Sequence, residues 1–289
     1  MVKFIIHGGC GAREAPKVPF SHYHEKLKWI IEAGVTYSKT HTAQELALYL
    51  AALLEDEPLF NAGTGSRLQK DGEIRMSASY MDSLQEKFSG VINIQNVKNP
   101  SIVAYRLQSE YNCVLASGEA TEYAHSTLHL EGYDPKTPMR QQEYEENIKG
   151  YTGTIGVVVW DSETQAVYTI TSTGGIGFEA PGRVGDTPTV AGNYASKHLG
   201  ISCTGKGEQI VNLGLAVRIE GRVRDGMPLH TAVQKSMDEA EEKGYYFGII
   251  AIDRAGEIIS SNTKQAQTLY AVYDGSKHYT FVEKTEDKR

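Results

Sequence analysis

The sequence predicts an α+β protein built from two stacked, mainly antiparallel β-sheets with helices on the outside. Its segments follow the order strand, paired helices, strands and helix, and then strands, paired helices and strands again. A parallel doubly wound sheet would need strict alternation of strands and helices. Two apolar, β-branched segments, 154–160 and 167–173, predict a central hairpin buried on both faces. With 289 residues and no internal repeat, the chain is expected to form one layered domain.

The first half of the chain begins with a strand at 3–7 that ends in the glycine cluster Gly8-Gly9-Cys10-Gly11, where another segment can approach closely. A helix is predicted from Ser21, and a second from the capping box Thr42-Ala-Gln-Glu45. Further elements are strands at 75–80, 90–94 and 113–116 and a helix from Asn99-Pro100 to Leu107. From about 118 to 153 the periodicity fades, which predicts a helix that tapers into a mobile linker.

The second half repeats this grouping after the central hairpin. A glycine- and proline-rich loop leads to a strand at 200–204, followed by one helix through Ile210, Leu213 and Ala216. The other elements are a helix at 228–243, a hairpin of 247–252 with 257–260, and a hairpin of 269–273 with 278–282.

Composition excludes several functional classes. The net charge of −7 gives no basic footprint for nucleic acid or for an anionic membrane surface. The apolar run near Met1 is too short for a signal peptide, so a cytoplasmic protein with a small-molecule or protein partner is expected. The three cysteines, Cys10, Cys113 and Cys203, lack disulfide or zinc spacing and are each expected to be small buried residues.

Glycine-flanked polar clusters follow several predicted strands. They are Asn61 with Gly63 and Gly65, 171–175, Arg183 with Asp186, and Thr204 with Gly205 and Gly207. Glycine at the end of a strand lets a backbone N–H reach a ligand without a Cβ in the way. These clusters are therefore the candidate binding and catalytic groups.

Thr154 admits two interpretations. It can simply open a core strand, as β-branched residues often do. Alternatively, the Gly153-Thr154 bond is cut, and Thr154 becomes an N-terminal nucleophile whose own α-amine is its base.

Arg183 and Asp186 together match the two charged ends of an α-amino acid. A guanidinium binds a carboxylate with two parallel hydrogen bonds, and a carboxylate accepts from an ammonium. The alternative is that they pair with each other or with surface neighbours. Thr204-Gly205 likewise suits either an oxyanion site or a capped helix start. His7 is expected to be a satisfied structural histidine.

Read together, the motifs resemble those of the plant-type L-asparaginase and isoaspartyl peptidase family, from residue 4 to about 262. They are His7-Gly-Gly-Cys-Gly-Ala12, Phe60-Asn-Ala-Gly63, Met81-Asp82, Gly153-Thr-Ile-Gly156, Thr171-Ser-Thr-Gly-Gly175, Pro181-Gly-Arg-Val-Gly-Asp186 and Cys203-Thr-Gly-Lys-Gly-Glu208. The resemblance implies an N-terminal nucleophile hydrolase with a four-layer αββα sandwich. It further implies self-cleavage before Thr154 into an α subunit, 1–153, and a β subunit, 154–289.

The resemblance also implies an activity and residue roles. The family hydrolyses the β-amide of L-asparagine and β-aspartyl dipeptides through an acyl-enzyme on the threonine, releasing L-aspartate. Thr173 matches the residue that assists the nucleophile, and Thr204 and Gly205 match the oxyanion hole. The remaining implied roles are the α-carboxylate grip for Arg183, the α-ammonium partner for Asp186, and the substrate-binding turn for Gly207.

Two further implications concern ions and assembly. The loop from Leu54 to Thr64 is similar to the family's sodium-binding loop, which steadies Asn61. Its candidate backbone carbonyls are those of Leu54, Glu55, Glu57, Phe60, Ala62 and Thr64. No cofactor is expected for catalysis, and a homodimer of αβ units is implied.

Two alternatives remain. One is a glycosylasparaginase-type amidase, against which the lack of a signal peptide and of cysteine pairs argues. The other is an uncleaved, inactive relative that serves as a binding protein. The chain also departs from the family pattern at Gly244-Tyr-Tyr-Phe-Gly248, which is expected to add bulk near the site and bears on the leaving group.

Overall fold

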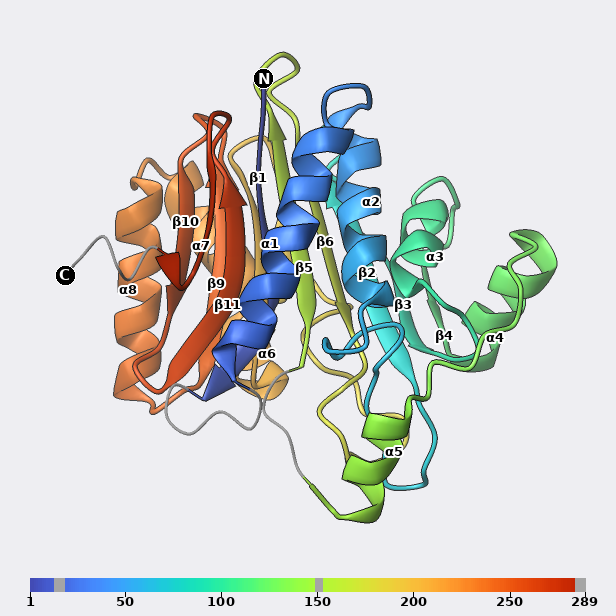
Figure 1. The fold of residues 1–289 in the computed structure, drawn as a ribbon. Coiled ribbons are helices and arrows are strands. Elements are labelled where there is room, and N and C mark those ends of the chain that lie inside the picture. Colours follow the sequence, from blue (N-terminus) through green and yellow to red (C-terminus); the bar gives the residue numbers. More distant parts are fainter. Residues whose placement is uncertain (13–18, 149–152, 284–289) are drawn as a thin grey trace.

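The computed structural model describes residues 1–12, 19–148 and 153–283. Up to the bond before Thr154 the elements are β1 (Val2–Ala12), α1 (Phe20–Tyr37), α2 (Ala43–Asp56), β2 (Met76–Asp82), β3 (Ser89–Ile94), α3 (Pro100–Leu107), β4 (Val114–Ala116), α4 (Ser117–Glu122), the π-helix η1 (Tyr123–Thr127) and α5 (Pro138–Glu145). Beyond it lie β5 (Ile155–Asp161), β6 (Val167–Thr173), β7 (Asn193–Ala195), β8 (Leu199–Gly205), α6 (Gly207–Leu213), α7 (Leu215–Arg224), α8 (Leu229–Glu242), β9 (Phe247–Asp253), β10 (Ile258–Asn262), β11 (Ala266–Tyr273) and β12 (His278–Thr280) (Figure 1).

Two sheets organise the described residues, so the α+β class is confirmed. The larger has eight strands in the order β12-β11-β1-β5-β6-β2-β3-β4, and its neighbours are antiparallel except β3 and β4. The smaller has four antiparallel strands in the order β10-β9-β8-β7. The predicted hairpin β5–β6 lies at the centre of the larger sheet and is buried along almost its whole length.

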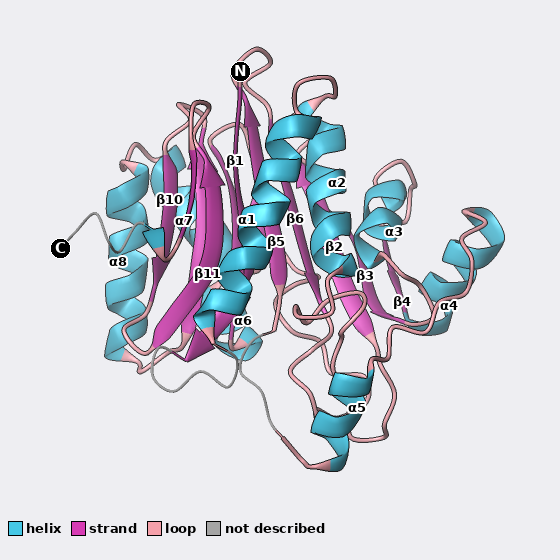
Figure 2. Ribbon diagram, in the orientation of Figure 1, coloured by secondary structure: helices cyan, strands magenta, loops and turns pink. Residues whose placement is uncertain are grey.

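The sheets pack face to face, and helices cover their outer faces (Figure 2). Helices α1 and α2 lie against the larger sheet, while α6, α7 and α8 lie against the smaller one. Strand β9 shows why both faces are buried. Ile250 and Ile252 join the core shared with the larger sheet, whereas Ile249 and Ala251 join the core under the helices, as the two-residue period of a strand requires.

The capping box is confirmed, because Glu45 N donates to Thr42 Oγ1 at 3.2 Å and Thr42 N donates to Glu45 Oε2 at 2.8 Å. Two local predictions are wrong. Helix α1 begins after Pro19, so Ser21 lies inside it rather than capping it. The single helix through Leu213 and Ala216 is two helices, since Gly214 adopts a left-handed conformation with φ of 55°.

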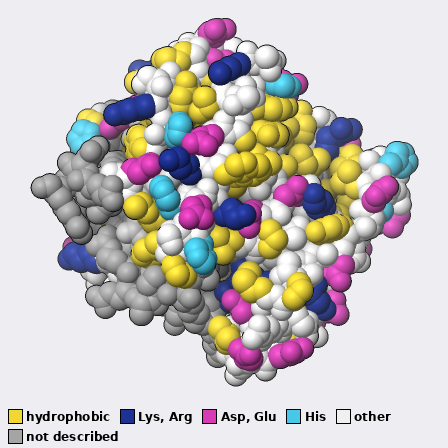
Figure 3. Space-filling view, viewed as in Figure 1, with side chains coloured by type: hydrophobic (Ala, Val, Ile, Leu, Met, Phe, Trp, Pro, Cys, Tyr) yellow, Lys and Arg dark blue, Asp and Glu magenta, His cyan; other side chains and the backbone are white. Residues whose placement is uncertain are grey.

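Other differences are small. Strand β7 is absent from the sequence prediction because its three residues lie within a glycine- and proline-rich loop. Cys10 and Cys203 are buried as predicted, but Cys113 is half-exposed because it precedes β4, the edge strand of the larger sheet. No helix in the described part of the chain is long and apolar enough to cross a membrane. On the face shown in Figure 3, acidic and basic side chains are interspersed.

The segment 118–153 contains α4, η1 and α5 within its described part, and residues 149–152 lie outside the described residues. Helix α5 is attached to the loop after α2 through the buried Arg140, which donates to Gly65 O at 2.6 Å and to Leu59 O at 3.2 Å. The mobility of this segment and its release by cleavage stay predictions.

Candidate active site

A buried polar layer joins the two sheets close to one set of strand ends, the set that includes the start of β5. His7 Nε2 lies 3.0 Å from Ser202 Oγ, which lies 2.7 Å from Thr171 Oγ1. Gly156 faces the same group, and a Cβ on it would fall 2.1 Å from Ser202 Oγ, so only glycine fits. Burial lowers the pKa of His7 to about 3 and thus keeps the ring neutral. His7 is therefore the satisfied structural histidine that the sequence predicts.

This layer explains how three threonines that are distant in sequence lie together at the same end of the two sheets. Thr154, Thr173 and Thr204 lie two residues from Gly156, Thr171 and Ser202, respectively. Each step leads toward the same edge, because β5 starts there while β6 and β8 end there. Side chains two residues apart on a strand share a face. The threonines are therefore presented together at the end of the sheets marked by the start of β5 in Figure 1.

The Gly153-Thr154 bond lies at this edge in the continuous chain. Thr173 Oγ1 donates a hydrogen bond of 2.6 Å to Gly153 O and accepts one of 3.1 Å from Gly175 N. The Thr154 hydroxyl also donates to Gly153 O. Hydrogen bonds to a carbonyl oxygen draw electron density from the carbonyl carbon and stabilise an oxyanion that forms there. The arrangement thus places the hydroxyl of Thr154 beside a polarised carbonyl.

Asn61 holds the turn that follows Thr173. Its side chain accepts from Arg67 N at 2.9 Å and donates to Gly175 O at 2.6 Å, while its own carbonyl accepts from Gly174 N at 2.9 Å. A Cβ on Gly153 would fall 3.1 Å from Asn61 Nδ2. The structure therefore brings Asn61 beside both Thr173 and the bond in question.

The glycine cluster of β1 forms the other side of this site. Gly9 has a φ of 111°, and a Cβ on it would fall 3.3 Å from Thr154 O. The close approach predicted for this cluster is therefore confirmed, and the segment that approaches is the one carrying Thr154.

Arg183 and Asp186 do not pair with each other. Arg183 donates to Glu208 through Nε at 2.7 Å and through Nη2 at 2.9 Å, which is the surface-neighbour alternative. A guanidinium has five N–H donors, and the two on Nη1 have no hydrogen-bond partner among the described residues. The sequence analysis included Glu208 in a motif but assigned it no role, although an acidic residue directly after the glycine-flanked turn was a usable signal.

Gly207 lies between the two charged groups. A Cβ on it would fall 2.7 Å from Asp186 Oδ1 and 3.0 Å from Arg183 Nη2. Asp186 is buried, and its Oδ2 has no hydrogen-bond partner among the described residues. Burial raises the pKa of Asp186 to about 7, an effect that Arg183 partly opposes. The three residues therefore form a compact cluster in which a carboxylate still needs a partner.

Thr204 and Gly205 lie at the end of β8, next to this cluster. Thr204 Oγ1 is buried and lacks a hydrogen-bond partner within the part of the chain that the structure describes. It caps no helix, since the N-cap of α6 is Lys206. Gly205 has a φ of 137°, and a Cβ on it would fall 2.5 Å from Phe247 Cα, so its glycine is required. The capped-helix interpretation of Thr204 is therefore wrong, and its buried hydroxyl still needs a partner.

The loop after α2 turns several carbonyl oxygens inward. A Cβ on Gly63 would fall 2.4 Å from Glu55 O, and one on Gly65 would fall 2.3 Å from Pro58 O and 2.8 Å from Phe60 O. A hard cation prefers such oxygen ligands. Glu55 O and Glu57 O also accept bonds from Thr64 N and Phe60 N within the loop. Two of the six candidate carbonyls are thus already hydrogen-bonded, and sodium binding by this loop stays a prediction.

Glu55 has a second role that the sequence analysis missed. Its buried carboxyl accepts from Ser172 Oγ at 2.6 Å and from Ser101 Oγ at 2.7 Å, and burial raises its pKa to about 7. It thereby ties β6, one residue before Thr173, to α2 and α3. Its position directly after the apolar run Leu53-Leu54, on the side of α2 that faces the core, was the available signal.

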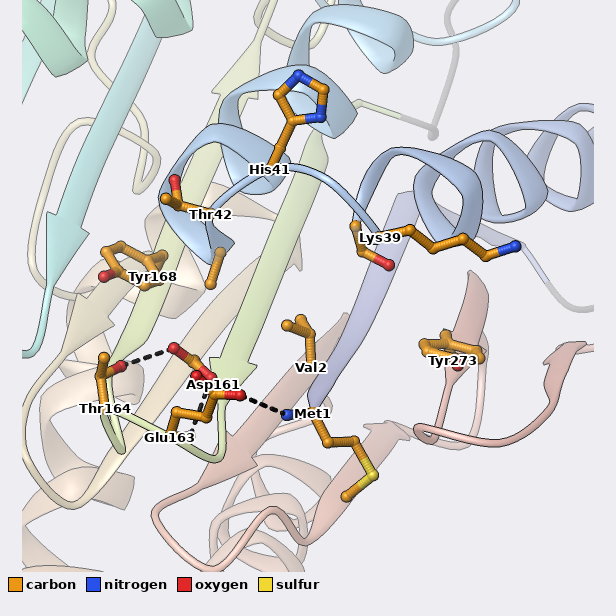
Figure 4. A pocket seen from close by; sticks show the side chains of 12 residues that line it. Met1, Val2, Lys39, His41, Thr42, Asp161, Glu163, Thr164, Tyr168 and Tyr273 are labelled. Carbon is orange, nitrogen blue, oxygen red and sulfur yellow. Dashed lines mark hydrogen bonds and ion pairs between the residues drawn. The ribbon is translucent and has the colours of Figure 1, made fainter.

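A cavity of about 540 Å³ lies at the opposite strand ends of the larger sheet, away from the start of β5 (Figure 4). Its lining includes Met1, Val2 and Asp161, where β1 begins and β5 ends. Because Thr154 precedes the start of β5, this cavity is separate from the candidate active site.

Comparison with known proteins gives the family. A family model described as asparaginase matches residues 1–282. A protein of Synechocystis sp. named isoaspartyl peptidase/L-asparaginase is 40% identical over 90% of this chain and 84% of its own length. One of Nostoc sp. with the same name is 39% identical over 95% and 92%, and a plant-type L-asparaginase of Thermococcus kodakarensis is 35% identical over 91% and 94%. The resemblance drawn from the motifs is thereby confirmed, and the chain belongs to this asparaginase family.

Proposed function

We propose that this chain is a self-cleaving threonine hydrolase that acts on the β-amide of L-asparagine and on β-aspartyl dipeptides and releases L-aspartate. The observation that carries the proposal is the pair of hydroxyls, Thr154 and Thr173, both donating to the carbonyl of Gly153. The names of the relatives, isoaspartyl peptidase/L-asparaginase and plant-type L-asparaginase, support this substrate class.

Self-cleavage comes first in this mechanism. The Thr154 hydroxyl attacks the carbonyl carbon of Gly153, and Thr173 stabilises the oxyanion. The bond between Gly153 C and Thr154 N then breaks as the nitrogen takes the proton of the hydroxyl, and water hydrolyses the resulting ester to a Gly153 carboxylate and the free Thr154 hydroxyl. The products are an α subunit, 1–153, and a β subunit, 154–289, of one four-layer αββα domain of the N-terminal nucleophile hydrolase type. Asn61 holds the turn beside Thr173 in position for this step.

The freed α-amine of Thr154 then serves as the base. Its reference pKa of about 7.7–8.0 leaves a useful neutral fraction near pH 7, which can take the proton of the hydroxyl. The hydroxyl attacks the substrate β-carbonyl, whose oxygen is stabilised by Thr204 Oγ1 and Gly205 N–H. The amine leaving group takes a proton, and water hydrolyses the acyl-enzyme to aspartate. No cofactor takes part in these steps.

Substrate recognition falls to the cluster around Gly207. The free Nη1 donors of Arg183 bind the α-carboxylate while Glu208 retains the rest of the guanidinium. Asp186 accepts from the α-ammonium, which gives its unpartnered Oδ2 a partner. Gly207 leaves room for the α-carbon between them.

The carbonyls of Leu54, Glu55, Glu57, Phe60, Ala62 and Thr64 are the proposed holders of a structural sodium ion, which would stiffen the loop and so steady Asn61. The ion takes no part in bond breaking. We further propose that two αβ units form a homodimer, as the family resemblance implies.

The burial of Asp186 predicts a pH effect on binding. Because its pKa is raised to about 7, the carboxylate becomes protonated as pH falls through that value, and it then loses its attraction for the α-ammonium. KM for a β-aspartyl substrate should therefore rise below pH 7. Well below the pKa of Asp186, where most of its carboxyl groups are protonated, the rise should be about tenfold per pH unit. Steady-state kinetics from about pH 6 to 8 measure this, and Asp186→Asn should give a high KM that no longer changes there. A wild-type KM that stays constant would contradict the role of Asp186.

Turnover tests the function itself. Cleaved protein is incubated with L-asparagine, a β-aspartyl dipeptide and glycosylated asparagine, and the release of aspartate is measured. We expect hydrolysis of the first two. Turnover of glycosylated asparagine alone would establish the glycosylasparaginase alternative. A lack of turnover for all three would favour the binding-protein alternative.

A further inference from the structure

The turn that carries Gly205 and Gly207 also carries an exposed cation. Lys206 lies between these two glycines, and its side chain is exposed. Its backbone N donates to Tyr246 O at 3.0 Å, and its Nζ lies 6.0 Å from the centre of the Tyr246 ring. In the described part of the chain, no carboxylate lies within ion-pair distance of this ammonium. Arg183, by contrast, forms an ion pair with Glu208.

The Lys206 side chain extends over the Tyr246 ring. The ring packs with Cys10 of β1 and Ala266 of β11 in a small buried cluster. An ammonium over an aromatic face is attracted by the ring, which favours this placement of the flexible stem. The bulk expected from the Gly244-Tyr-Tyr-Phe-Gly248 departure is therefore present beside the turn, and it faces β1.

The topology of the smaller sheet separates this cation from the groups that recognise the α-amino acid. Strand β8 ends at Gly205 and lies between β9 and β7. Tyr246 leads directly into β9, whose Phe247 is paired with Gly205. Asp186 lies on the other side, because Gly192, just before β7, is packed against it. Lys206 and Asp186 thus flank the end of β8 from opposite sides.

This arrangement matches the two ends of a β-aspartyl dipeptide. In such a molecule the scissile carbonyl lies between the α-carbon of the aspartyl residue and the leaving amino acid. With the α-carbon held near Asp186 and the carbonyl at Thr204 and Gly205, the leaving amino acid extends away from Asp186. It points toward the side of β8 that neighbours β9, where Lys206 lies. That amino acid carries a carboxylate, whereas the ammonia released from asparagine does not.

We propose that Lys206, held over Tyr246, binds the C-terminal carboxylate of the leaving amino acid and so gives the site a preference for β-aspartyl dipeptides with a free C-terminus. This specificity role rests on the proposed function. A flexible lysine stem suits leaving residues of different size, since its ammonium acts as a point charge without a fixed bonding plane.

The test compares β-aspartyl-leucine with β-aspartyl-leucine amide, which differ only in the C-terminal charge. In wild-type protein we expect kcat/KM to be about two- to fivefold higher for the acid at low ionic strength, the range of an exposed ion pair, and the ratio to fall with added salt. Lys206→Met keeps an apolar stem on the ring and should bring the ratio to about one, whereas Lys206→Arg should preserve it. Lys243→Met, an exposed lysine past the end of α8, is the matched control and should also preserve it.

The outcomes separate the two proposals. Equal rates for acid and amide in wild-type protein, or an acid preference that survives in Lys206→Met, would overturn the role of Lys206 and leave the proposed function intact. If cleaved wild-type protein hydrolyses neither compound nor asparagine, both proposals fail.

Discussion

The variant Thr154→Ala should remain a single chain of 289 residues, whereas wild-type protein should separate into fragments of 153 and 136 residues on a denaturing gel (289 − 153 = 136). Alanine lacks the hydroxyl that donates to Gly153 O, so no attack on that carbonyl can occur. The expected loss is complete for both self-cleavage and turnover. Mass spectrometry of the smaller product should place its first residue at Thr154.

Two control variants make this result specific. Thr154→Ser keeps a hydroxyl at the same position and should still cleave, although more slowly if the methyl group of threonine restricts the hydroxyl rotamer. Thr164→Ala removes a threonine in the exposed turn between β5 and β6, where its hydroxyl donates to Asp161 and accepts from Ala166 N, and should cleave like wild type. Cleavage of Thr154→Ala at the same bond would eliminate Thr154 as the nucleophile.

Arg183→Ala should lose activity mainly through substrate binding. Truncation removes the guanidinium that the proposal assigns to the α-carboxylate and leaves Glu208 without its partner. Hydrogen bonds to charged groups contribute about 1.5–3 kcal/mol, which corresponds to a rise in KM of about 10- to 150-fold. Initial-rate kinetics with a β-aspartyl dipeptide measure KM and kcat separately, and the change in kcat should be smaller.

Arg222→Ala is the matched control for this variant. Its side chain is 16% exposed, against 15% for Arg183, and it also pairs with a glutamate, Glu239, but it lies on α7 away from the site. It should leave KM unchanged. Arg183→Lys should recover only part of the binding, since lysine keeps the charge but not the planar fork. An unaltered KM in Arg183→Ala would exclude the assigned contact.

Much of the fold could be predicted because local patterns and burial agree. The capping box at Thr42 fixes the start of α2, and the β-branched run after Thr154 fixes a strand buried on both faces. Prediction of element boundaries failed where the backbone conformation of one residue ended a helix, and where a strand was too short to show a pattern. Gly214 breaks a continuous apolar stripe into α6 and α7 without any change in hydrophobic pattern, and β7 is too short to carry a period.

The candidate site was predictable as a set of residue types but not as a set of contacts. Glycines beside small hydroxyls and a nearby Arg–Asp pair marked the loops that matter. The sequence left open whether Arg183 pairs with Asp186 or with a neighbour, and the structure assigns the partner as Glu208. Similarly, only burial reveals that Glu55 joins Ser172 to Ser101, since a helical glutamate is usually solvated.

By itself, the sequence determined the α+β class, the central hairpin and the family of this protein, because strand periodicity and ordered motifs are properties of short segments. Only the tertiary structure decided which ends of the strands meet. His7, Gly156, Thr171 and Ser202 come from four separate strands, and their contacts set the edge at which Thr154, Thr173 and Thr204 emerge. That information lies in the packing of two sheets, where His7 and Ser202 come into contact across 195 positions of sequence, and no local pattern can encode it.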